Sequence, residues 1–276
     1  MHSIIKYNKK ECQNLKKSKF SLALVLMLVL SVIVSACGND NSSDKKSGSS
    51  DVAQELRVLE SAEIPSMDSV MAEDTVSFTA LNNVNEGLYS QDQDNNFVPA
   101  VAEGEPEMNE DGTEFTVKLK EGLTWSNGTA LTAHDFVYAW QRAIDPANAS
   151  TYGPYMMNGK IAGATEITEA AAAEQDYDVT TLGVEAADDT TLVVKTVTPM
   201  TVDFFKSLMA FGTFYPQNQE FVEAQGDKYA TSADTVLYNG AFVMTDCSGS
   251  TDSEWIKEKN EKEISNWIKS CWYSSI

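Results

Sequence analysis

The sequence predicts a mixed α/β fold, and three observations support this prediction. Strand-like and helix-like segments alternate along the chain without an internal repeat. The clearest unit, residues 111–146, combines an alternating apolar strand, a tight turn and an amphipathic helix. Beyond an apolar leader, about 240 residues remain, which is enough for one large domain or two small ones.

The leader, residues 1–36, has the features of an export signal. Six lysines precede an uncharged run at residues 20–36, and small residues stand directly before Cys37. Residues 34–37 (VSAC) resemble the lipobox of bacterial lipoproteins, in which the cysteine thiol is acylated and the chain is cut before it. A transmembrane anchor is the alternative, but the run is slightly shorter than the ~20 apolar residues of a spanning helix. We therefore expect lipid attachment at Cys37.

A flexible polar linker is predicted after the leader. Residues 37–54 are rich in Ser, Asp, Asn, Lys and Gly and show no apolar periodicity. Ordered structure is predicted to begin with a strand at residues 55–59. The next apolar residues favour a helix over residues 75–89. They are Val76, Leu81, Val84 and Leu88.

The unit at residues 111–146 gives the most specific local prediction. Apolar and polar residues alternate at 115–119, which predicts a half-buried strand. The Asn-Gly pair at residues 127–128 favours a tight turn. Thr132, followed three positions later by Asp135, predicts the start of a helix that ends before Pro146. Its inward face is expected to carry Phe136, Val137, Trp140 and Ile144.

Shorter elements are predicted in the second half of the chain. Helices are expected at residues 166–175, 199–209 and 216–224, and a strand at residues 190–197. In the second of these helices we expect three side chains to face the core. They are Phe204, Phe205 and Leu208.

The chain is strongly acidic, with a formal net charge of −21 at pH 7. Six of the 20 basic residues and one of the 41 acidic residues lie in the leader, so residues 37–276 carry a net charge of −26. Such a surface repels phosphate backbones, so nucleic acid is not expected as a partner. It also repels anionic membrane surfaces, so we expect a covalent lipid rather than a basic patch to be the anchor.

The cysteines and histidines give no sign of a metal site. Cys12 lies in the leader and Cys37 is the expected acylation site, which leaves Cys247 and Cys271. These two can form a disulfide outside the cell, but their spacing matches no metal-binding pattern. We therefore expect no metal.

The sequence also lacks the signatures of catalysis. It has no phosphate-binding loop and no nucleophile elbow. Trp125 and Trp140 stand on the apolar phase of their elements, so we expect both in the core. His134, in the first turn of a predicted helix, is expected at the surface. We therefore expect no cofactor and no enzymatic activity.

Three segments of the chain stand in a characteristic order. They are residues 99–103 (PAVAE), 111–128 (DGTEFTVKLKEGLTWSNG) and 131–146 (LTAHDFVYAWQRAIDP). Together with residues 182–194 and 238–242, they resemble the oligopeptide-binding proteins, the family 5 extracellular solute-binding subunits of peptide ABC importers. The resemblance covers roughly residues 55–260.

This resemblance implies a periplasmic-binding-protein-like α/β fold of type II, in which two lobes enclose a peptide and an extra subdomain sits on the first lobe. It implies capture of extended oligopeptides through main-chain pairing and lobe closure, without chemistry. The implied partner is the membrane permease of an ABC importer. The implied location is the outer face of the bacterial cytoplasmic membrane, lipid-anchored as in Gram-positive bacteria. A peptide-pheromone receptor lipoprotein is an alternative.

The resemblance also implies peptide-binding positions. They are Glu73, Asp74, Thr75, Tyr152, Asn239, Gly240 and Ala241. Glu73 matches a carboxylate near the peptide, where a buried ammonium group needs an acid. Asp74 and Thr75 would offer main-chain groups, and Tyr152 matches a tyrosine that lines the site. A solvated loop acid, a partly buried tyrosine and, at residues 239–241, a plain turn remain alternatives.

The family pattern breaks after Lys262. We expect the first lobe only, with first-lobe segments at residues 55–88 and 206–262, the extra subdomain at 89–205 and a divergent tail at 263–276. A frameshift explains the tail better than a terminal helix, although its apolar residues have helical spacing. With the second lobe missing, we expect weak peptide binding, and a nonfunctional fragment is a further alternative. The apolar tail residues are Ile264, Trp267, Ile268, Cys271 and Trp272.

Overall fold

The computed structural model describes residues 55–60, 62–248 and 269–275, with the side chains of residues 62–245. The chain divides into two units, Met1–Asp51 and Val52–Ile276, and every described residue belongs to the second. The expected signal, the lipid site at Cys37 and the linker at residues 37–54 lie outside the described residues. Within the described ranges, no helix combines the length and the apolar character needed to span a bilayer.

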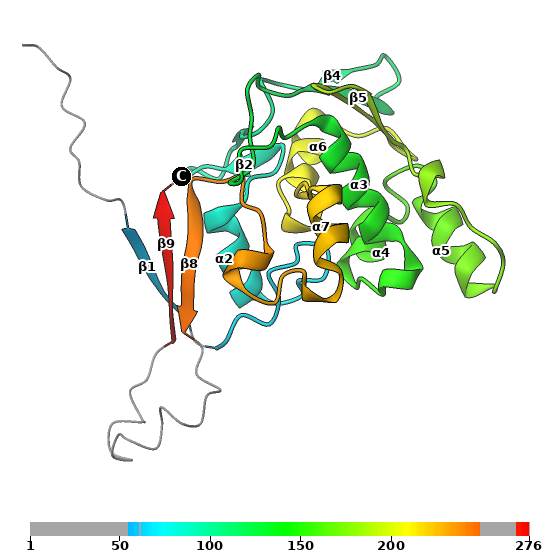
Figure 1. The fold of residues 1–276 in the computed structure, drawn as a ribbon. Helices are drawn as coiled ribbons and strands as arrows, with labels where there is room; N and C mark the ends of the chain where they lie inside the picture. The colour runs from blue at the N-terminus through cyan, green and yellow to red at the C-terminus, as the bar shows by residue number, and fades with distance from the viewer. Residues whose placement is uncertain (1–54, 61, 249–268, 276) are drawn as a thin grey trace, which may run out of the picture. The chain divides into compact units, whose positions relative to one another are not determined.

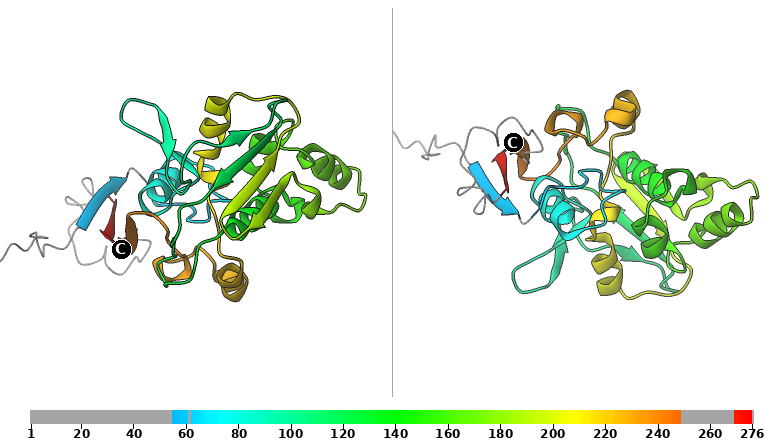
Figure 2. Two further views of the ribbon diagram at one scale, coloured as in Figure 1. Left: turned by 90° about the horizontal axis from the view of Figure 1, so that it is seen from above. Right: turned by 90° about the horizontal axis from the view of Figure 1, so that it is seen from below.

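Strands and helices alternate along the described chain, as the sequence predicts (Figures 1 and 2). The strands are β1 (Glu55–Glu60), β2 (Tyr89–Gln91), β3 (Phe97–Pro99), β4 (Glu107–Met108), β5 (Glu114–Lys118), β6 (Val184–Asp188), β7 (Thr191–Lys195), β8 (Phe242–Ser248) and β9 (Lys269–Ser275). The helices are α2 (Thr75–Val84), α3 (Ala133–Ile144), α4 (Tyr152–Met157), α5 (Ala164–Ala172), α6 (Val202–Met209) and α7 (Gln219–Gln225).

A four-stranded antiparallel sheet, in the order β4-β5-β7-β6, forms the centre of the largest packed region. Phe115 pairs with Val194, and Val117 pairs with Leu192, so these four apolar residues share one face and are buried there. Between them stand side chains that are partly or fully exposed, including Lys118. The predicted alternation in residues 115–119 is therefore confirmed. Helix α3 packs against β6 and β7.

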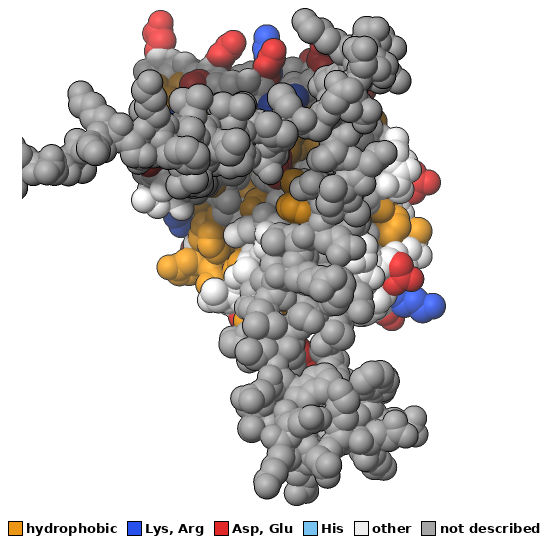
Figure 3. Space-filling view, turned by 90° about the vertical axis from the view of Figure 1, so that its left-hand side faces the viewer, with side chains coloured by type: hydrophobic (Ala, Val, Ile, Leu, Met, Phe, Trp, Pro, Cys, Tyr) orange, Lys and Arg blue, Asp and Glu red, His pale blue; other side chains and the backbone are white. Residues whose placement is uncertain are grey.

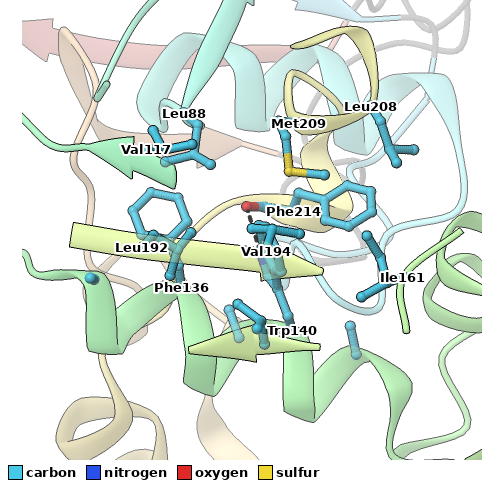
Figure 4. Packing of buried hydrophobic residues seen from close by; sticks show 14 of the residues in the cluster. Leu88, Val117, Phe136, Trp140, Ile161, Leu192, Val194, Leu208, Met209 and Phe214 are labelled. Carbon is cyan, nitrogen blue, oxygen red and sulfur yellow. Dashed lines mark hydrogen bonds between the residues drawn. The ribbon is translucent and has the colours of Figure 1, made fainter. Parts of the chain in front are cut away.

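Aromatic side chains pack against one another in the hydrophobic core beside this sheet (Figure 4). The rings of Phe115 and Phe205 stack with their centroids 4.1 Å apart. Trp140 is fully buried, and its Nε1 donates to the carbonyl oxygen of Phe214 at 3.0 Å. Trp125 is also buried, so both tryptophans are core residues as predicted. This tryptophan hydrogen bond joins α3 to the chain that follows α6.

A second apolar cluster surrounds α2 and β8. It contains Leu81, Val84, Tyr215, Tyr238 and Met244, all of them buried. Strand β8 contacts α2 and belongs to a three-stranded antiparallel sheet in the order β1-β9-β8 (Figure 1). The strand predicted at residues 55–59 is confirmed.

The final residues form a strand and not a helix. Lys269–Ser275 pairs with β1 on one side and β8 on the other, which corrects the terminal helix that the apolar spacing had left open. Pairing with two neighbouring strands supplies backbone hydrogen bonds on both edges, and this outweighs a weak helical period. The preceding tail, residues 263–268, lies outside the described residues.

One side chain of α6 was predicted on the wrong face. Phe205, Leu208 and Met209 are buried, but Phe204 is 48% exposed. Positions 205, 208 and 209 have the i, i+3, i+4 spacing of one helical stripe, and position 204 falls outside it. The helix itself is confirmed.

Acidic side chains are frequent on the surface of the described region, in line with the net charge. Figure 3 shows them at the edges of one face, with exposed hydrophobic side chains between them.

The domain boundaries that we expect at residues 88 and 205 stay a prediction.

Candidate functional site

A pocket of about 320 Å³ lies at the N-terminal end of α2. It draws its walls from three segments that are far apart in the sequence: the start and outer face of α2, the start of α4, and the turn after α6. Four of the predicted peptide-binding residues line it. They are Glu73, Asp74, Thr75 and Tyr152. The other lining residues, which the sequence did not single out, are Phe78, Asn82, Ala210, Phe211 and Gly212.

Helix α2 starts beside the pocket because Asp74 caps it. The Asp74 backbone is extended, and its Oδ1 accepts from the Ser77 amide at 2.9 Å while Oδ2 accepts from the Ser77 hydroxyl at 2.7 Å. This carboxylate is therefore occupied by the helix, which leaves the main chain at residues 74–75 as its contribution to the pocket. First-turn amides of a helix have no intrahelical partner, so Thr75 lies where a polar ligand group can bind.

Glu73 places a carboxylate on the rim of the pocket. Its Oε1 accepts from the Thr151 hydroxyl at 2.6 Å, and the side chain is exposed to solvent. Thr151 directly precedes Tyr152, so this hydrogen bond joins the acidic and aromatic sides of the pocket. A carboxylate that can still accept hydrogen bonds suits an ammonium group, which can donate up to three.

Aromatic rings form the opposite wall. The Tyr152 ring lies 5.6 Å from Phe78 and 5.3 Å from Phe211, and Phe78 lies 4.9 Å from Phe211, measured between ring centroids. Gly212 makes room for this cluster, because a Cβ there would lie 2.8 Å from the Phe78 ring. The wall offers apolar area that can cover a side chain or an extended peptide backbone.

A buried ionic contact supports the loop that leads to Glu73. Arg142 of α3 approaches Asp68 at 2.8 Å, and Gln217 Nε2 donates to Asp68 Oδ1 at 2.8 Å. Arg142 also stands over the Tyr229 ring, 5.6 Å from its centroid. Arg142 lies outside the apolar stripe of α3, directly after Gln141, so the local sequence did not single it out.

The beginning of α4 is held just as closely. The Ser150 hydroxyl donates to the carbonyl oxygen of Val70 at 2.6 Å and accepts from the Gly153 amide at 3.1 Å. Gly153 lies against α3, where a Cβ would come within 1.8 Å of the Ala143 carbonyl oxygen. Only glycine allows this approach, and it fixes Tyr152 at the pocket.

The remaining three predicted residues lie at the other end of α2. Asn239 accepts from Asn85 Nδ2 at 3.0 Å and from the Glu86 amide at 3.2 Å, and it donates to the Glu86 carbonyl oxygen at 2.9 Å. The Gly240 amide donates to Val84 O at 2.9 Å. None of the residues Asn239, Gly240 and Ala241 lines the pocket. The contacts of Asn239 and Gly240 at the end of α2 are structural, and a ligand role for all three residues stays a prediction.

No group in the described part of the chain is arranged like a metal centre: no three His, Cys, Asp or Glu residues gather closely enough to hold an ion. A second pocket, of about 450 Å³, lies between residues 63–67, 230–234 and 244–245, but it contains none of the predicted residues. The pocket at α2 is therefore the candidate site.

Comparison with known proteins identifies the family. Residues 96–262, more than half of the chain, match the model of the bacterial extracellular solute-binding proteins, family 5 Middle. The chain belongs to this family. Family 5 is a group of solute-binding proteins rather than a class of enzymes, and its members work outside the cytoplasm.

Named family 5 relatives extend the match. The dipeptide-binding protein of Lactococcus lactis is 33% identical over 230 residues, which is 83% of this chain and 38% of the relative. The oligopeptide-binding protein OppA of Bacillus subtilis is 31% identical over 252 residues, which is 88% of this chain and 44% of the relative. The chain thus spans well under half the length of these relatives.

Solved structures show the same fold. OppA of Listeria monocytogenes bound to peptide superposes with a TM-score of 0.62 at 42% identity, over 68% of this chain and 35% of that one. The substrate-binding domain of an oligopeptide ABC transporter of Bacillus anthracis gives a TM-score of 0.63 at 42% identity, over 68% of this chain and 34% of that one. The expected periplasmic-binding-protein-like fold, represented by one part of it, is confirmed.

Proposed function

We propose that this chain contributes to an extracellular peptide-binding subunit of an ABC importer. The observation that carries the proposal is the convergence of Glu73, Asp74, Thr75 and Tyr152 in one pocket of a family 5 chain. The named relatives bind dipeptides and oligopeptides, and one structural neighbour is titled as bound to peptide. The function is capture by reversible binding, with no catalysis and no cofactor.

In the proposed complex, the pocket holds one end of an extended peptide. Glu73 receives the cationic α-amino group, because its free side faces the pocket and the chain as a whole is acidic. The main chain at Asp74 and Thr75 hydrogen-bonds to the peptide backbone. The Tyr152 ring, packed on Phe78 and Phe211, covers the first side chain. Asn239 and Gly240 hold the C-terminal end of α2.

The proposal includes the expected setting of the protein. A lipid on Cys37 anchors the chain to the outer face of a bacterial cytoplasmic membrane of the Gram-positive type, and the partner is the membrane permease. The polar stretch at residues 37–54 provides the reach between the lipid and the folded region. Nucleic acid is not a partner of so acidic a chain.

A receptor for peptide pheromones is a second candidate. The pheromone receptor PrgZ, whose structure is titled with its mode of peptide binding, superposes with a TM-score of 0.60 at 35% identity over 67% of this chain. Both functions use the same pocket, so they differ in the preferred peptide and not in the chemistry of capture.

Calorimetric titration of the full chain in detergent with tri- to hexapeptides tests the proposal. We expect saturable binding whose affinity falls about 10- to 100-fold in Glu73→Gln and for N-acetylated peptides, since a charge-assisted hydrogen bond contributes ~1.5–3 kcal/mol. The matched control is Glu121→Gln, which removes the same charge from an exposed turn outside the pocket. Equal binding of free and acetylated peptides contradicts the role of Glu73. No binding of any peptide favours the nonfunctional fragment.

A further inference from the structure

The two cysteines beyond the expected signal and lipid site lie on neighbouring strands. Cys247 is in β8 and Cys271 is in β9, and the antiparallel register places them directly opposite each other. The adjoining pairs, Asp246 with Trp272 and Ser248 with Ser270, fix this register on both sides. Residues this far apart in sequence are brought face to face by strand pairing alone.

This backbone placement meets the distance requirement of a disulfide. Directly opposed residues in an antiparallel pair have Cα atoms about 4.5 or 5.5 Å apart, depending on the hydrogen-bonding position. Disulfides join cysteines whose Cα atoms are about 4.4–6.8 Å apart. A shift of one residue in register would place Ser270 or Trp272 opposite Cys247, so the two cysteines face each other only in the observed pairing.

We propose that Cys247 and Cys271 form an intrachain disulfide that joins β8 to β9. The bond would close residues 248–270 into a loop and hold β9 between β1 and β8. The inference goes beyond peptide capture and uses the proposed function in one respect only: export places the two thiols in an oxidising compartment. Acylation of Cys37 and removal of Cys12 with the leader would leave no competing thiol.

The reaction is a thiol–disulfide exchange with a small-molecule or protein disulfide as the oxidant. One cysteine thiolate attacks a sulfur of the oxidant, which forms a mixed disulfide and releases the first reduced thiol. The second cysteine thiolate attacks the mixed disulfide at the protein sulfur and releases the second reduced thiol. The protein loses two hydrogens, and the oxidant gains them.

Thiol mapping of the full chain tests the proposal. The protein is refolded in a glutathione redox buffer, free thiols are alkylated under denaturing conditions, and tryptic peptides are analysed with and without reduction. We expect residues 229–257 and 270–276 to appear as one linked species two hydrogens lighter than the sum of the separate peptides. Alkylation of either cysteine before reduction should be about tenfold lower than after reduction. Single substitutions Cys247→Ser and Cys271→Ser should each expose the other thiol.

A register control makes the test specific. Combining Cys271→Ser with Ser270→Cys moves the thiol one position along β9, opposite Ser248, and should lower the yield of linked peptide several-fold. Combining all four changes, Cys247→Ser, Ser248→Cys, Ser270→Cys and Cys271→Ser, restores an opposed pair and should restore the link. Full alkylation of both cysteines without reduction overturns the proposal, as does a link to Cys37 or between two chains. The readout is independent of peptide binding, so failure of the proposed function does not decide it.

Discussion

The two ends of α2 differ in how their polar groups are used. At the C-terminal end, the side chain of Asn239 and the amide of Gly240 occupy the backbone groups of residues 84 and 86. At the N-terminal end, Asp74 occupies only the Ser77 amide and hydroxyl, and the rest of the turn opens into a pocket. Both ends carry residues predicted to bind peptide, but only those at the N-terminal end line the pocket. The difference teaches that an enclosed, hydrogen-bonded helix end supports the fold, whereas an open one keeps groups available for the peptide contacts that we propose.

The largest effect is expected at the ion pair beneath the open end. Arg142→Met should lower the free energy of unfolding by about 3–5 kcal/mol, because it leaves the Asp68 carboxylate buried without its cation. Urea unfolding followed by circular dichroism measures this change. In the double variant Arg142→Met with Asp68→Asn, the buried charge is gone, so most of the loss should be recovered. If the double variant is as unstable as the single one, the charge is not the cause.

A smaller effect on stability is expected when one glycine near each end of α2 is replaced by alanine, which adds a methyl group. Gly240→Ala places a Cβ 2.7 Å from the backbone carbon of Val84, which cannot move without shifting α2. The expected loss of stability is about 1–3 kcal/mol. In Gly212→Ala the close contact is with the ring of Phe78, a side chain and not backbone, so this change should cost less than about 1 kcal/mol.

Peptide affinity should respond to these two variants in the opposite order. The Phe78 ring displaced by Gly212→Ala fills part of the pocket, so this variant should bind peptide more weakly while it remains folded. Gly240→Ala, measured well below its melting temperature, should bind like the unmodified chain. A stronger binding defect in Gly240→Ala than in Gly212→Ala would remove the distinction between a supporting end and a recognising end.

The smallest effect is expected in the pH dependence of a third helix end, the start of α3. Burial raises the pKa of Asp135, although the hydrogen bond from the Thr132 amide, 2.7 Å long, opposes this rise. Asp188, fully exposed, has its pKa lowered by hydrogen bonds from Thr190. Carbon-13 NMR of the carboxyl groups should therefore show Asp135 titrating above, and Asp188 below, the ordinary aspartate range.

The consequences for stability have opposite signs. A proton binds Asp135 more tightly in the folded chain, so its contribution falls as the pH rises from the unfolded pKa, ordinarily 3.8, through the folded pKa. The contribution of Asp188 is present above pH 3.8 and is lost as the pH falls through its lowered pKa. Asp135→Asn keeps an oxygen that can accept from Thr132 and should abolish the first dependence. An unchanged pH profile in this variant would assign the effect to another group.

Strong local periodicity explains which parts of the fold were predictable. The strand β5 and the helix α3 follow directly from alternation and from an apolar stripe behind a capped start. Helix α4 was not predicted, because Gly153 and Pro154 stand in its first turn and its stability comes from packing on α3. The error at Phe204 has another origin: Phe204 and Phe205 each have helical spacing to Leu208, and packing buries the stripe of Phe205 and Met209 instead.

The site was predictable only where its residues are neighbours in sequence or match a family position. Glu73, Asp74 and Thr75 form one continuous segment, and they and Tyr152 were all assigned from the resemblance. Phe211 and Gly212 line the pocket because the chain after α6 passes beside it. No local sequence pattern predicts that path. Residues 239–241 were also assigned from the resemblance, and the structure places Asn239 and Gly240 in contact with the C-terminal end of α2, outside the pocket.

The dual attachment of α3 has one further consequence. Through Arg142 this helix holds the loop before α2, and through the close approach at Gly153 it holds the start of α4. The acidic and aromatic sides of the pocket are therefore both attached to α3, although they lie far apart in the sequence. A ligand that binds here meets a surface whose geometry is already fixed. Most of the conformational entropy lost on binding is therefore lost by the ligand and not by the protein.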